Sequence, residues 1–425
     1  MQLKRADFEN VRQSRILLFV AIFLLFVPKI NLISTGAYEG AGLRLDDILI
    51  LITAPFFLFI IAKKGSISKL EVYFYIFFFY TLLVYFLNLP YSRGNILYPL
   101  RFFEYWMFFY FGRLFGGQEF FLKVMGAFVI YSGILIIAQD LHLIGGFRDG
   151  VYKRILNMPT GSTNGSYEIS MVLALISPVF FLAKNKFTTY FFLIFSAFLI
   201  VLTESRTALA IQSLTFLFWI IFINKSSLIR KAVVLILLPI SLIIFVITNL
   251  DLFERFFMLF TSDTYYALET ILSAAPAQLP GDGSKEFLEQ QALLKTGAVQ
   301  SSLLESAGSS ADLSLMVRFN KWNWGFSSFL AQGYFYIFVG IGGGVLGNAL
   351  DGGLIRILIE YGIVGLCLFL LFMSKTVKNF RSIEFTLVII FLLSNLFIDY
   401  YLSYKVTSVF FLILGYLFSR RKLLA

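Results

Sequence analysis

The sequence predicts an all-α polytopic integral membrane protein. Hydrophobic residues make up 59% of the chain and charged residues 14%, whereas soluble domains average about 45 to 50% apolar and about 25% charged residues. The 52 phenylalanines and the mean hydropathy of +0.82 show the same excess. The apolar residues also gather in stretches close to the length that spans a hydrocarbon core, about 20 residues. Composition and stretch length together exclude a soluble globular domain.

Twelve such stretches predict about twelve transmembrane helices. The first follows a basic flank and ends in VPKINL without a small-residue cleavage site, so we expect a retained anchor rather than a signal peptide. The stretches are expected at about residues 16–33, 46–62, 72–89, 96–115, 120–141, 167–183, 187–203, 207–223, 231–249, 353–373, 384–400 and 405–419.

The chain divides into three parts. Residues 1–249 carry the first nine helices, residues 250–352 form one long loop, and residues 353–425 carry the last three helices. Basic residues concentrate in alternate short loops and at both termini, which predicts cytoplasmic termini and a periplasmic position for the long loop. The middle of that loop is polar and rich in Ser, Gly and Ala, and it predicts one amphipathic helix between flexible ends. Loops longer than about 12 to 15 residues usually carry function or are disordered inserts.

Composition also excludes several classes of site. Most basic residues behind the net charge of +10 lie in short loops, where they set topology, so we expect no nucleic acid partner. The single Cys367 and the single His142 exclude an intrachain disulfide, a thiolate metal cluster and a polyhistidine site. Phosphate-binding loops, dinucleotide fingerprints and metal-ligand spacings are absent from the sequence. We therefore expect neither a metal nor another cofactor.

Charged residues recur at the predicted outer helix ends. Arginine's planar guanidinium suits phosphate oxygens, and the nearby Trp322 adds a face on which a sugar or an isoprenoid chain can pack. Two simpler interpretations stay open, because such arginines can anchor a chain at the membrane surface and Arg101 can pair internally with Glu104. The charged residues are Arg101, Glu104, Arg154, Glu168, Glu204, Arg206 and Arg318.

Residues 340–370 hold the most informative pattern. A glycine-rich loop runs into Asp351, and the helix predicted from Gly353 carries Arg356 and Glu360. A charge at the centre of a bilayer helix costs about 2.5 to 3.5 kcal/mol, so Arg356 and Glu360 are expected to face a polar cavity or to pair with each other. Asp351 can be either an N-cap of the helix or a catalytic group.

Several motifs follow one another in a recognisable order. They are the Ser205-Arg206 junction, the long periplasmic loop, Arg318 followed by Trp322, a G-x-G turn at Gly340 and Gly342, a polar pair at Asp351-Gly352, and, after nine residues, Gly362 and Gly365. This order resembles the bacterial O-antigen polymerase and O-antigen ligase superfamily. The ligases carry His-Asn at the polar pair, so Asp351-Gly352 favours the polymerase branch. Arg154 and Gly165 also match the R-x10-G pattern described for periplasmic loops of polymerases.

The resemblance implies a GT-C-like membrane glycosyltransferase that joins undecaprenyl-diphosphate-linked oligosaccharides at the periplasmic face of the inner membrane. Membrane lipid and a chain-length regulator protein would be its other partners. Within the implied site, Asp351 is the first candidate for a general base, with Glu168 or Glu204 behind it. Cationic side chains would neutralise the leaving diphosphate in place of a metal. The substrate-binding candidates are Arg206, Arg318, Arg154, Arg101, Arg356 and Trp322.

Other functions remain open at this point. An O-antigen ligase would transfer the finished glycan to the lipid A-core instead. A transporter or flippase for lipid-linked oligosaccharides would also have many spans and buried charge, but it should show an internal repeat and charges near the membrane midplane. The cell-wall glycan polymerases of the shape, elongation and division family share the chemistry and differ in substrate. A comparison of hydropathy between the two halves of the chain would separate the transporter from the enzymes.

Overall fold

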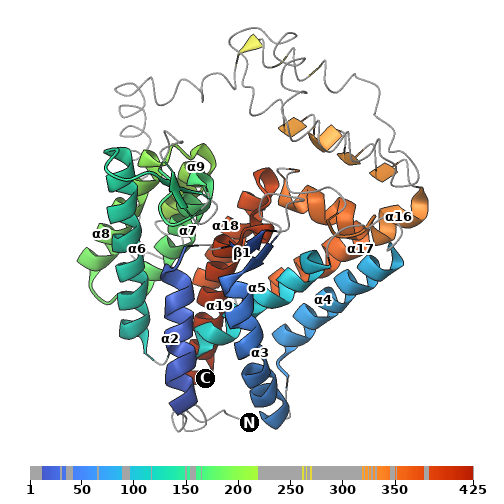
Figure 1. Cartoon of the computed structure of the whole chain (residues 1–425), viewed down its shortest axis with the longest axis horizontal. Coiled ribbons are helices and arrows are strands. Elements are labelled where there is room, and N and C mark those ends of the chain that lie inside the picture. Colours follow the sequence, from blue (N-terminus) through green and yellow to red (C-terminus); the bar gives the residue numbers. More distant parts are fainter. Residues whose placement is uncertain are drawn as a thin grey trace.

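The computed structural model of the chain is a helical bundle (Figure 1). It describes residues 12–28, 31–34, 42–64, 67–88, 96–115, 117–148, 151–153, 159–163, 165–218, 333–344, 352–377 and 382–424, with short pieces between 261 and 350. The predicted stretch at 231–249 and the predicted amphipathic helix of the long loop lie outside the described residues.

The described parts of the other eleven predicted apolar stretches fall mainly on helices, although the first helix ends at Phe26 and residues 31–33 belong to a strand. The stretch predicted at 167–183 divides into α7 and the 3₁₀ helix η1, because Pro178 lacks the amide hydrogen that would continue an α-helix. The helices are α2 (Arg12–Phe26), α3 (Leu45–Lys64), α4 (Lys69–Leu87), α5 (Leu97–Arg113), α6 (Gln118–Asp140), α7 (Ser166–Ile176), η1 (Ser177–Leu182), α8 (Lys186–Leu202), α9 (Arg206–Phe218), α16 (Tyr334–Val339), α17 (Gly353–Thr376), α18 (Ile383–Phe397), η4 (Tyr400–Leu402) and α19 (Tyr404–Leu424).

Two short hairpins depart from the all-helical prediction. Strand β1 (Asn31–Ser34) pairs antiparallel with β2 (Gly42–Arg44), and β3 (Gly146–Arg148) pairs antiparallel with β4 (Val151–Lys153). Each hairpin follows the end of a helix, α2 or α6. Segments this short carry no long alternating pattern of apolar and polar residues, which is the signal that predicts a strand.

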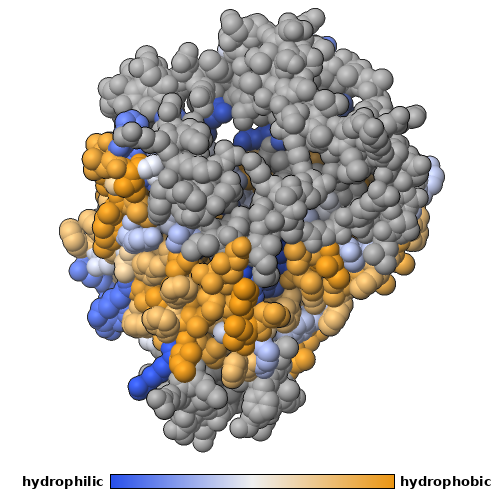
Figure 2. All heavy atoms as spheres, viewed as in Figure 1, coloured by the Kyte–Doolittle hydropathy of each residue, from blue (hydrophilic) through white to orange (hydrophobic). Residues whose placement is uncertain are grey.

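The outer surface of the bundle is apolar. Among the described residues, α4, α6 and α17 are long and apolar enough to cross a membrane. Large side chains on the outward faces are more than half exposed, for example Phe79 at 62%, Ile134 at 63% and Ile194 at 65%. Hydrophobic residues cover much of the lower half of the face in Figure 2. The protein therefore has the helical, apolar character of a membrane protein.

Close backbone packing joins α5 to α19. A Cβ atom at Gly112 would overlap the carbonyl group of Leu412, and a Cβ atom at Gly415 would overlap that of Phe109. Small residues allow such close approach between helices in membranes, where tight packing has to replace the hydrophobic effect. Next to this contact the buried Trp106 ring stacks on Phe109, with ring centroids 4.3 Å apart. This pair of helices forms the centre of the core.

Among the described helices, five begin at the same end of the bundle: α3, α5, α7, α17 and α19. Polar contacts link their starts or the residues just before them, including Arg44 to Glu104 and Ser403 to Glu168. The 3₁₀ helix η4 lies among them, because the Tyr105 hydroxyl of α5 donates to its Leu402 carbonyl at 2.9 Å. We call this region the charged end. The C-terminus lies at the opposite end of the bundle from α9 and α16 (Figure 1).

Candidate functional site

Helix α17 is broken in its middle. Gly362 has φ +68° and ψ −176°, so the helical hydrogen bonds stop there. The loop before α17 supplies replacements, because the amides of Ile341 and Gly342 donate to the carbonyl oxygens of Ile359 and Glu360 at 3.1 and 3.0 Å. Non-helical backbone at membrane depth is tolerated only where protein satisfies its polar groups in this way.

The glycines of the sequence motif make this contact possible. A Cβ atom at Gly340 would overlap the Glu360 carbonyl, and a Cβ atom at Gly362 would overlap the Phe338 carbonyl. Both glycines also have positive φ, a conformation that L side chains rarely adopt. The G-x-G turn and the first glycine of G-x-x-G therefore face each other, which gives a structural reason for their presence in one motif.

A buried ion pair lies one turn before the break. The Nε atom of Arg356 is 2.9 Å from Oε1 of Glu360, and both side chains are fully buried. Asp399, just before η4, adds a second carboxylate 3.1 Å from Nη1 of Arg356. The amide of Gly344 also donates to Oε1 of Glu360 at 3.0 Å. The predicted internal pairing of Arg356 with Glu360 is present. Two carboxylates therefore hold the guanidinium, and the role of Arg356 in substrate binding stays a prediction.

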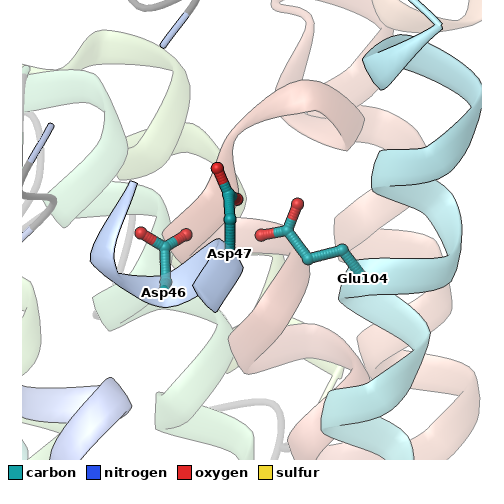
Figure 3. Close-up of side chains that lie close together, drawn as sticks. All are labelled: Asp46, Asp47 and Glu104. Atoms are coloured by element: carbon teal, nitrogen blue, oxygen red, sulfur yellow. The ribbon is translucent and has the colours of Figure 1, made fainter. Parts of the chain in front are cut away.

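A second network surrounds Arg44 at the start of α3, and Figure 3 shows the three carboxylates that belong to it. Three carboxylates, those of Asp46, Asp47 and Glu104, have oxygens within 4.8 Å of one another, a spacing that could hold a metal ion. However, the Nη2 atom of Arg44 lies 2.7 Å from both Asp47 and Glu104, and its Nε atom lies 3.3 Å from Asp46. The cation at the centre of this cluster is thus the buried guanidinium itself.

This network changes the partner that the sequence predicted for Glu104. Its ion pair is with Arg44, whereas the spacing on the helix had pointed to Arg101. Arg101 still interacts electrostatically with Glu104, and its guanidinium lies over the ring of Tyr98, 5.5 Å from the centroid. Arg356 lies 5.4 Å from the same ring centroid. Tyr98 therefore joins the two charged networks through cation–π contacts.

Two predicted site residues meet around η4. The Glu168 carboxylate, in the first turn of α7, is half-buried and accepts a hydrogen bond from the Ser403 hydroxyl at 2.8 Å. Tyr400 is near enough to both Glu168 and Arg318 for each to interact electrostatically with its hydroxyl. Lys405 also interacts electrostatically with Glu168. The structure thus brings a candidate base and a candidate substrate-binding arginine into one neighbourhood.

Trp322 packs against the start of α17. A Cβ atom at Gly352 would lie 2.7 Å from the indole Nε1 atom of Trp322. The Phe319 ring lies beside the same indole, with centroids 5.1 Å apart. The tryptophan predicted to contact substrate therefore belongs to the charged end, close to the helix that follows the polar pair.

The spacing of Glu204 and Arg206 has a structural cause. Glu204 has φ +54° and directly follows Thr203, the C-cap of α8, so it occupies the left-handed position that often ends a helix. Its side chain is exposed. Arg206 is the first residue of α9 and is half-buried. The two charges thus mark a tight turn between two helices.

Two predicted site residues, Asp351 and Arg154, lie outside the described residues, so their roles stay predictions. The structure does answer one question about the start of α17. Its N-cap is Gly352, which has no side chain to cap the helix. No side chain at the N-cap position itself therefore caps α17.

Sequence reasoning missed several buried charges at the charged end. The sequence patterns predicted no site at Asp399, Asp46, Asp47, Lys405 or Arg44. One signal was available, since Asp46 and Asp47 form an acidic pair at a helix start, where the helix dipole favours carboxylates. Asp399 and Lys405 appear in the sequence only as isolated charges beside apolar stretches.

Comparison with known families and with curated proteins found no match to this chain. The fold and the site define a helical protein of membrane character with arginine–carboxylate networks at one end of its bundle. The resemblance to the O-antigen superfamily rests on the residues quoted for it.

Proposed function

We propose that the chain is a polysaccharide polymerase of the O-antigen type, an integral membrane glycosyltransferase of the bacterial inner membrane. The charged end is the observation that carries this proposal. Five helix N-termini meet there, and helix N-termini favour anions. Arg318, Arg101 and Trp322 lie at the same end. Positive helix ends, arginines and aromatic faces on an apolar bundle suit a ligand that combines a diphosphate, sugars and an isoprenoid chain.

The proposed reaction transfers a glycan between two lipid carriers. The donor is a growing glycan linked through diphosphate to undecaprenol, and the acceptor is one repeat unit on the same lipid. An acceptor hydroxyl attacks the anomeric carbon of the donor, a new glycosidic bond forms, and the bond to the diphosphate breaks. Undecaprenyl diphosphate leaves with the bonding electron pair, and the hydroxyl proton passes to a general base.

Each step has a candidate among the charged residues. Arg318, Arg101 and Arg206 are half-buried and would stabilise the charge that develops on the leaving diphosphate, together with Arg154. Arg356 would not contact the diphosphate itself, because its guanidinium is paired with Glu360 and Asp399. With these arginines at the leaving diphosphate, the proposed reaction needs no metal ion to stabilise its charge.

Two carboxylates compete for the role of general base. The sequence motif favours Asp351, while the hydrogen bond from Ser403 and the electrostatic interaction that both Glu168 and Arg318 have with Tyr400 favour Glu168. Glu204 is the weakest candidate, because its exposed side chain belongs to a turn whose backbone serves to end α8. We take Glu168 as the base among the described residues.

Substitution of Arg318 tests the proposal directly. We expect Arg318→Ala to reduce polymer formation about 10²-fold or more, because loss of a donor aimed at developing charge typically costs that much. Arg318→Lys should retain part of the activity, since it keeps the charge and loses the bidentate fork. The measurement is the ladder of lipid-linked glycans in a strain lacking the native gene, with the protein level checked by blot.

The exposed Lys123, which pairs with Glu119 on the surface of α6, provides the control. Lys123→Ala should leave the ladder normal. A normal ladder from Arg318→Ala at normal protein level would reject the role of this arginine. Accumulation of long glycans that stay on the lipid carrier would instead identify the chain as a ligase.

The proposal includes a topology of twelve spans. Both termini would lie in the cytoplasm, and residues 250–352 would face the periplasm together with the charged end. Reporter fusions after Asp282 and after Leu424 should therefore report opposite compartments. The same compartment for both fusions would contradict the topology, whatever the activity of the protein.

The break in α17 favours a second candidate, a transporter or flippase for lipid-linked oligosaccharides. Broken helices near a binding site are common in secondary transporters. A flippase defect would leave single repeat units on the cytoplasmic face, while a polymerase defect would leave them on the periplasmic face. Digestion of intact spheroplasts with a glycosidase that cannot cross the membrane distinguishes the two, because only periplasmic repeat units are cleaved.

A further inference from the structure

Asp399 makes three contacts with one short stretch of chain. Its Oδ1 atom accepts a hydrogen bond from the amide of Gly352 at 2.8 Å, and its Oδ2 atom accepts one from the amide of Leu350 at 3.2 Å. The Nη1 atom of Arg356 also donates to Oδ2 at 3.1 Å. One carboxylate between α18 and η4 therefore holds the start of α17 at three points.

This carboxylate holds the backbone at the N-cap of α17 and just before it. The first amides of a helix have no partners inside it, and a side chain at the N-cap usually accepts from one of them. Here the N-cap is Gly352, and a larger residue would collide with Trp322. Asp399 instead binds the amide of the N-cap residue itself, which has no partner inside the helix, so this support of the helix start comes from another element.

The ion pair with Arg356 alone does not explain this arrangement. Arg356 already has Glu360 as a partner at 2.9 Å. A carboxylate that served only to balance the guanidinium would not need two peptide amides as well. The two amides belong to residues 350 and 352, on either side of position 351, so Asp399 determines where the backbone passes relative to Arg356.

We propose that Asp399 is the positioning residue of the polar pair: it holds the backbone of Leu350 and of Gly352, the sequence neighbours of position 351, against the start of α17. Its importance for the reaction rests on the proposed function. The positioning itself does not, so it can be tested separately.

The first test uses chemical labelling and needs no substrate. Cys367→Ser removes the only cysteine, and Asp351→Cys then introduces a reporter. We expect Asp399→Ala to raise the rate at which a membrane-impermeant maleimide labels this cysteine by about tenfold or more, because two hydrogen bonds to a charged group are lost. A reporter at the exposed His142, made by His142→Cys, should label at an unchanged rate. Equal rates at position 351 with and without Asp399 overturn the proposal.

The second test measures turnover in isolated membranes with lipid-linked repeat units. Asp399→Asn keeps the side-chain shape and should fold even if Asp399→Ala does not. We expect kcat to fall about tenfold or more while KM for the lipid substrate changes less than about threefold, since misplacement of a reacting group mainly affects the chemical step. Wild-type kcat in Asp399→Asn overturns the importance of this positioning for the reaction, while the labelling rates decide whether the positioning itself holds. If the native protein forms no polymer but the labelling responds to Asp399→Ala, the proposed function fails and the positioning holds.

Discussion

A strain whose only copy of the gene carries Glu168→Gln should accumulate single repeat units on the lipid carrier and form no ladder. Glutamine keeps the size of the side chain and an oxygen that can accept the Ser403 hydrogen bond, but it cannot take a proton. Loss of a general base typically lowers the rate about 10²- to 10⁴-fold, whereas loss of a purely structural contact should reduce the protein level instead. The readout is the glycan ladder, together with a blot of the membrane fraction.

Two matched carboxamide variants complete this experiment. Glu204→Gln alters an exposed carboxylate in a helix-ending turn and should leave the ladder nearly normal. Asp351→Asn tests the rival base: single repeat units from this variant and a normal ladder from Glu168→Gln would assign the base to Asp351. Normal ladders from both variants would contradict proton abstraction by either carboxylate.

Hydrophobic length predicted the helices well because it is a local property. The apolar runs that became α4, α6 and α17 can be recognised from about twenty consecutive residues without knowledge of any neighbour. The length of the apolar run does not predict the break in α17. Its cause is the loop at Ile341 and Gly342, which replaces the helical hydrogen bonds at the break. An apolar window contains no sign of that loop.

The ion pairs of the charged end also differ in whether the partners are close in sequence or far apart. Arg356 and Glu360 were predictable as a pair because residues four apart on a helix face each other. Asp399 lies 43 residues after Arg356 in the sequence. Arg44 lies 60 residues before its partner Glu104. Local spacing favoured Arg101 for Glu104, and only the packing of α3 against α5 reveals the actual pair.

The buried pair in α17 leads to the second large effect, which concerns stability. Glu360→Leu should destabilise the protein by about 3 to 5 kcal/mol, because removing one partner leaves a buried charge poorly compensated. The substitution also removes the acceptor for the Gly344 amide, which helps to hold the loop against the break. We expect a strongly reduced protein level and a lower midpoint of thermal unfolding in detergent.

The exposed pair Glu119–Lys123 is a matched control, since it has the same i,i+4 spacing and both side chains are at least 72% exposed. Glu119→Leu should change stability by less than about 1 kcal/mol. The double variant Arg356→Met with Glu360→Leu should recover part of the loss, because the uncompensated guanidinium is gone while Asp399 still binds the two amides at the start of α17. Equal unfolding midpoints for Glu360→Leu and Glu119→Leu would show that the broken helix does not depend on its buried pair. A double variant no more stable than Glu360→Leu alone would mean that the cost lies in the lost Gly344 contact rather than in the charge.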